Sequence, residues 1–306
     1  MSKTEIVTIN EVGPRDGLQN QKVPVNTAGK LAMIHALVKA GVRHIEVSSF
    51  VSPRAVPQMA DAAQVLEGLP AEDEMHYSVL VPNQKGYQRA KSAGAKSVAV
   101  VLSATEVMNQ KNINMSLASS RTVCNSVISE AKEDGLESRG YISVAFSCPF
   151  EGPVEPGIIL ELAQEMLESG ADEIIIADTI GAACPAEVSG LFRLLTERFG
   201  ANTMENRFSA HFHDTRAMAL SNVWAALQWG IRKFDSSIGG LGGCPFAPGA
   251  SGNLATEDAV VMLHQCGYDT GIDIKGLMKA IEVSEKLIQH KLGGRMMPWL
   301  SSRKNI

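Results

Sequence analysis

The sequence has few cysteines, and they form no recognisable pattern. Its 306 residues contain five cysteines, an odd number, and no two of them have the CxxC spacing of a zinc ribbon. These features argue against a disulfide framework and against a structural zinc site built from thiolates. They favour a reducing compartment, and we expect a cytoplasmic protein.

Long apolar runs and an excess of basic residues are also missing. No stretch of about 18 uncharged apolar residues occurs, and the N-terminal MSKTEIVTIN has no basic segment followed by an apolar run, so neither membrane insertion nor export is expected. The net charge of −5 argues against non-specific nucleic-acid binding, which needs a basic surface. We therefore expect neither a membrane nor a nucleic acid as a partner.

Short runs rich in β-branched residues alternate with longer segments of helical period. The predicted strands are residues 5–12, 44–50, 75–81, 97–103, 141–147, 172–178, 207–214 and 233–240. Each is followed by a predicted helix, and strands this apolar indicate a parallel sheet covered by helices. Eight such units favour an α/β fold of the (β/α)8 TIM-barrel type. An open doubly wound sheet is the alternative, but the first unit lacks the GxGxxG turn of a dinucleotide fold.

The domain organisation follows from the same pattern. No linker, internal repeat or low-complexity tract interrupts the chain. We expect residues 1–306 to form a single catalytic barrel domain. Helical pattern at residues 273–290 predicts additional C-terminal helices, which form an extension over about residues 270–306.

Polar residues fall where the predicted strands end. They are Arg15 and Asp16 after the first strand, Glu46 near the end of the second, Asp178 and Thr179 after the sixth, and His211 and His213 at the end of the seventh. In a parallel barrel the carboxyl ends of all strands meet at one face, where active sites are built. The sequence therefore predicts an active site at this face.

The stretch HFHD at residues 211–214 points to a metal. Side chains alternate along a strand, so His211 and His213 point the same way, with Cα atoms about 6.5 Å apart. One interpretation is a pair of hydrogen-bonded polar residues at the barrel mouth; the other is two imidazole ligands of a cation, joined by a carboxylate. Asp16 is the obvious carboxylate, because strands one, seven and eight lie together where an eight-stranded barrel closes, so Asp16, the two histidines and a residue of the loop after the eighth strand can meet. Asp214 is better explained as the cap of the next helix.

The glycine-rich stretch GGLGGCPFAPGASGNLATED at residues 239–258 follows the eighth strand. A loop of this length without regular structure is more often a functional lid than a connector. It contains Cys244, whose thiol acidity could serve proton transfer beside a cation. Asn253 could offer a carbonyl oxygen to the metal or cap the eighth helix, and the residues alone leave both open.

Six stretches together closely resemble one family. EVGPRDGLQN, SSFVSPRAVPQM, KNINMS, ADTIG, HFHDT and the glycine-rich loop are similar to those of the 3-hydroxy-3-methylglutaryl-CoA lyases, within the metal-dependent barrel lyases and aldolases. The resemblance spans about residues 5–290. It implies an acyl-CoA substrate and Mg²⁺ or Mn²⁺ held by Asp16, His211, His213 and Asn253. It also implies Arg15, Asp16, His211 and Cys244 as catalytic residues, with Gln19, Glu46, Arg139, Asp178, Thr179, Gly243 and Glu257 contacting the substrate or supporting the site.

The chemistry of such a cleavage suits these residues. Breaking the carbon–carbon bond of a 3-hydroxyacyl thioester needs a base for the hydroxyl, a stabiliser for the thioester enolate and an acid for the enolate carbon. Arg15 is the candidate stabiliser and Cys244 the candidate acid, while Asp16 and His213 are rivals for the base. A lyase for a longer-branched 3-hydroxyglutaryl thioester, a condensing synthase and a hydroxy-keto-acid aldolase are the alternatives. Members of the family tend to be dimers, so we expect a homo-oligomer.

Overall fold

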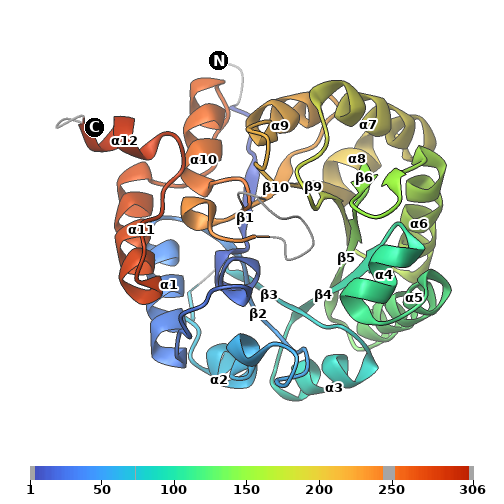
Figure 1. The fold of residues 1–306 in the computed structure, drawn as a ribbon, viewed down its shortest axis with the longest axis horizontal. Helices are drawn as coiled ribbons and strands as arrows, with labels where there is room; N and C mark the ends of the chain where they lie inside the picture. The colour runs from blue at the N-terminus through green and yellow to red at the C-terminus, as the bar shows by residue number, and fades with distance from the viewer. Residues whose placement is uncertain (1–3, 73, 244–251, 303–306) are drawn as a thin grey trace.

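The computed structural model describes residues 4–72, 74–243 and 252–302, and in these ranges eight parallel strands close into a barrel with helices outside it (Figure 1). The strands are β1 (Thr8–Glu11), β2 (His44–Ser49), β3 (His76–Leu80), β4 (Ser97–Ser103), β5 (Glu137–Ser143), β8 (Glu173–Asp178), β9 (Phe208–Phe212) and β10 (Lys233–Ser236). Around the barrel they follow the order β1-β10-β9-β8-β5-β4-β3-β2. The predicted (β/α)8 TIM barrel is confirmed.

Burial on both faces explains why these strands are so apolar. In β8, five of the six residues are buried, because the outer face packs under helices and the inner face fills the barrel. The barrel interior holds a small apolar cluster of Leu80, Ala99, Tyr141 and Ile175. Polar and ionised groups share the interior with it, and they lead to the site described below.

Helices return the chain from strand to strand. They are α1 (Thr27–Lys39), α2 (Ala62–Glu67), α3 (Gln84–Ser92), α4 (Glu106–Ile113), α5 (Leu117–Glu133), α6 (Pro156–Ser169), α7 (Pro185–Phe199), α8 (Ala201–Arg207), α9 (Ala219–Leu227) and α10 (Thr256–Gln265). Asparagine and serine side chains cap several of them: Asn26 Oδ1 accepts the Gly29 N–H of α1 at 2.9 Å, and Ser116 Oγ accepts the Ser119 N–H of α5 at 3.1 Å.

The fifth strand differs from its prediction. It spans Glu137–Ser143 rather than residues 141–147, and residues 147–148 and 152–153 instead form a two-stranded hairpin (β6, Ser147–Cys148; β7, Gly152–Pro153). The start of the strand carries Arg139, a residue that the pattern does not associate with a barrel interior. The structure accommodates it because Arg139 is buried beside two carboxylates, those of Glu173 and Asp235.

Two further helices follow the barrel, α11 (Ile274–Ile288) and α12 (Met297–Ser302). Asp273 caps the start of helix α11, since its side chain accepts the Gly276 N–H at 2.7 Å. The helix lies against α1 in the outer ring (Figure 1). Its buried residues recur at helical spacing, so one stripe faces the barrel body. The predicted C-terminal helices are present. Among the described residues, no helix combines the length and the apolar character needed to cross a bilayer.

Candidate active site

The turn after β1 places two charged side chains at the carboxyl face of the barrel. It is a short π-helix, Gly13–Gly17, that contains Arg15 and Asp16. A Cβ at residue 13 would lie 2.5 Å from Glu11 Oε1, so glycine lets the chain fold back over that carboxylate without displacing it. Single π-helical turns are frequent at functional sites because they alter the direction of side chains locally.

Asp16, His211 and His213 come together at this face. Each offers one atom to a common position, and these atoms lie within 4.8 Å of one another. The two histidines come from β9 and the residue next after it, and their ring centroids are 5.1 Å apart. Two imidazoles and a carboxylate at this separation can share a divalent cation. The residues expected from the sequence to meet therefore do meet.

Asn253 completes the cluster. Its Nδ2 donates to Asp16 Oδ2 at 2.9 Å and to the Leu241 carbonyl at 3.1 Å. Helix α10 begins after Ala255, and the Asn253 side chain makes no cap bond there. Among the described residues, Asn253 Oδ1 and His213 Nδ1 are buried polar atoms without a hydrogen-bond partner. Because such atoms are costly to leave unpaired, this oxygen and nitrogen fit a site that binds a cation.

The protonation states also suit a cation. Burial raises the pKa of Asp16, but the charges of Arg15 and of the two histidines outweigh it and hold that pKa below its ordinary value. Burial, helped by His211, lowers the pKa of His213 to about 3, so its imidazole is neutral. Burial also lowers the pKa of His211, but the hydrogen bond to Asp235 and the negative charges of Asp235 and Asp16 together outweigh it, so the net effect raises that pKa. An ionised carboxylate and a neutral imidazole are the forms that bind metals.

Arg15 is held by two carboxylates. Its Nη1 donates to Asp16 Oδ1 at 2.6 Å, and its Nε donates to Glu46 Oε1. Glu46 comes from β2 and is completely buried. Neither bond uses Nη2, so the guanidinium keeps donors for a ligand while its plane is fixed. Glu46, which was predicted to support the site, therefore contacts Arg15.

A cavity of about 490 Å³ opens beside this cluster. Of the predicted site residues, its lining includes Arg15, Asp16, Gln19, Thr179, His211, His213 and Gly243. The lining also contains the apolar side chains of Val51, Leu80 and Val101, from the loop after β2, from β3 and from β4, which pack in one cluster. A ligand in this cavity would meet both charged groups and hydrocarbon.

Two predicted residues lie behind the cavity and hold loops. Asp178, at the end of β8, accepts the backbone N–H groups of Ala182 and Ala183, each at 2.9 Å. Glu257, in the first turn of α10, accepts the Gly239 N–H at 3.0 Å and also the Gly294 N–H. Both carboxylates therefore contact backbone rather than the cavity.

Arg139 lies deeper in the barrel, toward the amino ends of the strands. It lines a separate cavity of about 160 Å³ together with His44 and His76. Its Nη2 donates to Glu173 at 2.9 Å and lies 3.4 Å from Asp235 Oδ1. Arg139 thus connects to the active face through Asp235 and through the ring of Tyr141, whose centroid lies 5.7 Å from the guanidinium carbon.

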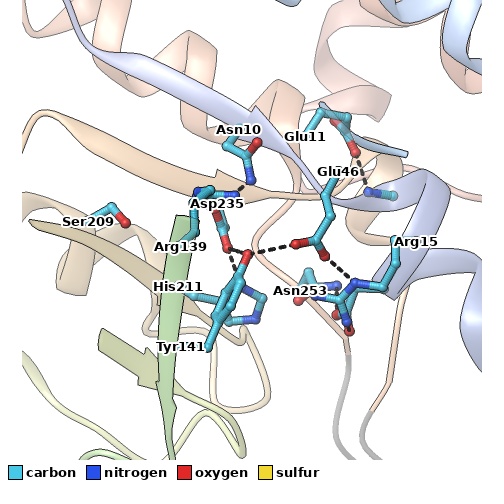
Figure 2. A network of polar contacts seen from close by, with 12 residues as sticks. Asn10, Glu11, Arg15, Glu46, Arg139, Tyr141, Ser209, His211, Asp235 and Asn253 are labelled. Atoms are coloured by element: carbon cyan, nitrogen blue, oxygen red, sulfur yellow. Dashed lines mark hydrogen bonds and ion pairs between the residues drawn. The ribbon is translucent and has the colours of Figure 1, made fainter. Parts of the chain in front are cut away.

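Asp235 and Tyr141 were not among the residues predicted from the sequence. Figure 2 shows both inside the barrel, close to Arg139 and His211. Asp235 Oδ2 lies 3.1 Å from His211 Nδ1 and accepts the Tyr141 hydroxyl at 2.7 Å, and Tyr141 also lines the active-site cavity. The available signal was a single acidic residue within the short strand KFDS; a lone charge in a buried strand needs a partner.

Cys244 lies outside the described residues, and the structure does not test its predicted role. The neighbouring Gly243 is described: its carbonyl accepts a hydrogen bond from Asn20 Nδ2 at 3.1 Å. The roles predicted for the other site residues likewise stay predictions, although their positions are now known.

Fold and site together define a (β/α)8 barrel enzyme with a candidate divalent-metal site at the carboxyl ends of its strands. Residues 6–283 match the HMGL-like family, and the chain belongs to this family. It is 44% identical to the hydroxymethylglutaryl-CoA lyase of Pseudomonas mevalonii, covering 92% of this chain and 93% of that protein.

Two other relatives bear on the ligand. The chain is 41% identical to a 3-hydroxy-3-isohexenylglutaryl-CoA/hydroxy-methylglutaryl-CoA lyase of Pseudomonas aeruginosa, covering 92% of each protein. A solved HMG-CoA lyase from Acinetobacter baumannii, in complex with coenzyme A and 3-methylmalate, superimposes with a TM-score of 0.92 at 34% identity. That match covers 100% of this chain and 98% of the other.

Proposed function

We propose that this protein is a carbon–carbon lyase that cleaves 3-hydroxy-3-methylglutaryl-CoA into acetoacetate and acetyl-CoA. The observation that carries the proposal is the meeting of Asp16, His211 and His213 beside Arg15 at one cavity, in a chain whose relatives are named for this reaction. The complex of the Acinetobacter baumannii lyase with coenzyme A supports an acyl-CoA as the substrate class.

Asp16, His211, His213 and the Asn253 carbonyl oxygen are the residues that would hold the metal, which we propose to be Mg²⁺ or Mn²⁺. Oxygen and imidazole donors without sulfur suit these ions. When bound, the cation would supply Lewis acidity toward the substrate oxygens and fix the orientation of the substrate.

The reaction balances without a redox partner. The C3 hydroxyl loses its proton, the C2–C3 bond breaks, and its electron pair moves to the thioester as an enolate. One proton then adds to C2. We propose that Arg15 stabilises the enolate oxygen; the contacts of its guanidinium with Asp16 and Glu46, at the cavity wall, support this role. Removing one such preorganised donor costs about 10²–10³ in turnover.

Proton transfer requires a base and an acid. Asp16 and His213 remain the candidate bases for the hydroxyl. The lowered pKa values favour an ionised Asp16 carboxylate and a neutral His213 imidazole, which are the forms that accept a proton. We propose Cys244 as the acid that protonates C2. Its neighbour Gly243 lines the cavity, which supports a thiol carried by this loop near the reacting carbon.

A longer-branched 3-hydroxyglutaryl-CoA is the second candidate substrate. The relative from Pseudomonas aeruginosa that is named for an isohexenyl substrate favours it. The apolar cluster of Val51, Leu80 and Val101 is suited to a hydrocarbon branch at C3. The homo-oligomeric state, the cytoplasmic location and the single-domain organisation stay predictions.

A product assay tests the proposal. The purified full chain would be incubated with Mg²⁺ and 3-hydroxy-3-methylglutaryl-CoA, and acetoacetate and acetyl-CoA would be measured in equal amounts. A longer-branched analogue in competition would then decide which substrate has the higher kcat/KM. Absence of acetyl-CoA release from both thioesters, with Mg²⁺ and with Mn²⁺, would contradict the proposed function.

A further inference from the structure

Asp235 is the point where four side chains of the barrel interior meet (Figure 2). It is 1% exposed and belongs to β10, whose register places it directly beside His211 of β9. Its Oδ1 accepts from Asn10 Nδ2 at 2.8 Å and lies 3.4 Å from Arg139 Nη2. Its Oδ2 accepts the Tyr141 hydroxyl at 2.7 Å and lies 3.1 Å from His211 Nδ1.

We propose that Asp235 is a positioning residue that holds His211 in the Nδ1–H tautomer and so leaves its Nε2 free of hydrogen to serve as a metal ligand. The inference rests on the proposed metal site, but it concerns the tautomer of His211, which can be measured without any metal. It adds a determinant of metal affinity that does not itself contact the cation.

The tautomer follows from what each group can donate. An ionised carboxylate only accepts hydrogen bonds, so His211 Nδ1 must carry the hydrogen between it and Asp235 Oδ2. In a neutral imidazole the other nitrogen, Nε2, then has a free lone pair. Carboxylates in this relation to a metal-binding histidine fix both its tautomer and its ring orientation.

The other three contacts suit an ionised carboxylate and hold it in place. Asn10 Nδ2, Arg139 Nη2 and the Tyr141 hydroxyl all present donors to it, and Arg139 adds a positive charge. Asn10 and Tyr141 donate from different strands, β1 and β5. A carboxylate held by donors on several strands cannot turn away from His211 without breaking one of these bonds.

Arg139 also dictates what asparagine would do at position 235. In Asp235→Asn one oxygen becomes an NH₂ group, which cannot accept a bond. Arg139 has only donors, so the NH₂ group is disfavoured at the Oδ1 position. It would take the Oδ2 position and donate to His211 Nδ1. That nitrogen must then be bare, which moves the hydrogen to Nε2, the atom needed for the metal.

The first experiment reads the tautomer directly. Long-range ¹H–¹⁵N NMR of the metal-free full chain at about pH 9, above the ordinary imidazole pKa, distinguishes Nδ1–H from Nε2–H. The His211 signals are assigned by their loss in His211→Asn. We expect Nδ1–H in the native protein and Nε2–H in Asp235→Asn. A native protein with the hydrogen on Nε2 would overturn the inference, even if the variant does not fold.

The second experiment measures Mn²⁺ affinity by titration of the free-ion EPR signal. We expect Asp235→Asn to bind Mn²⁺ about 10–100-fold more weakly than the native protein. The matched control is Glu173→Gln, which removes another carboxylate bonded to Arg139. Glu173 is mostly buried, and its side-chain partners are Arg139, Ser209 and Lys233 rather than His211. We expect the control to change the affinity no more than about threefold, within the range of indirect effects.

The outcomes separate the inference from the proposed function. Equal weakening by Asp235→Asn and Glu173→Gln would mean a general effect of the buried charges and would overturn the inference. Native protein that binds no Mn²⁺ and cleaves neither thioester would contradict the proposed function, while the NMR measurement would still decide the tautomer.

Discussion

Replacing Glu11 with glutamine is expected to stabilise the fold above neutral pH. Glu11 ends β1 and is completely buried beneath the site. Its Oε1 accepts the Gly13 N–H at 2.8 Å and the Ile238 N–H at 2.9 Å, and its Oε2 accepts the Thr256 hydroxyl at 2.6 Å. Glutamine keeps one oxygen for the two N–H groups, and its NH₂ group can donate to the Thr256 oxygen, because Thr256 can donate in turn to Ser236.

The magnitude comes from the titration of Glu11. Burial, only partly offset by these hydrogen bonds, raises the pKa of Glu11 to about 7 from an ordinary value of 4.5. Between these two pH values the unfolded chain has lost the proton and the folded chain retains it. The stability present below 4.5 is therefore lost as the pH rises through 7, by about 3 kcal/mol at most. Glutamine does not titrate, so the variant does not lose this stability.

The assay is urea unfolding of native protein and Glu11→Gln at about pH 5 and about pH 8. We expect the unfolding free energy of the variant, relative to the native protein, to rise by up to about 3 kcal/mol between the two pH values. Glu11→Ala is the contrasting variant, because it leaves two N–H groups and a hydroxyl without a partner and should cost about 3–6 kcal/mol. A relative stability of Glu11→Gln that does not change with pH would refute the reasoning.

Three further changes have defined outcomes. Asp16→Asn should weaken Mn²⁺ binding by about 100-fold and abolish cleavage, since it removes the only ionised ligand; near-normal turnover would contradict the ligand assignment. Cys244→Ser should lose most of the cleavage rate and keep its metal, and equal rates under reducing conditions would exclude the thiol as the acid. Burial and the stacked His76 lower the pKa of His44 to about 4, so stability should fall as the pH drops from 6.5 toward 4, where the unfolded chain takes up the proton first. His44→Phe keeps the stacked ring, and its urea midpoint should therefore fall less over this range than that of the native protein.

Several parts of the site could be predicted from the local sequence pattern. Strand polarity brings residues that follow different strands to one face, which is why Asp16 and the two histidines could be expected to meet. Alternation along a strand explains the shared direction of His211 and His213. The role of Asn253 was left open, and its contact with Asp16 favours the metal over the helix cap.

The bounds of the fifth strand and the contacts of two acidic residues could not be predicted from the local sequence pattern. The fifth strand was placed four residues too late, because Arg139 makes the start of that strand look exposed until its carboxylate partners are known. Asp178 and Glu257 look like site residues by position, yet each contacts backbone N–H groups. The direction in which a loop turns its side chains depends on φ and ψ angles that residue type alone does not specify.

The alternation of apolar strands with helices, together with the residues that follow those strands, was enough to indicate the barrel, its active face and three of the groups that meet there. Local periodicity carries that information because it reflects the direction of each side chain relative to its own backbone. The partners of Asp235 came from the folded barrel alone. His211 faces it through the register of two neighbouring strands, and Tyr141 reaches it across the interior from a strand that is 94 residues away in the chain. Such contacts depend on how the barrel closes and on strand stagger, and no short segment of sequence encodes either.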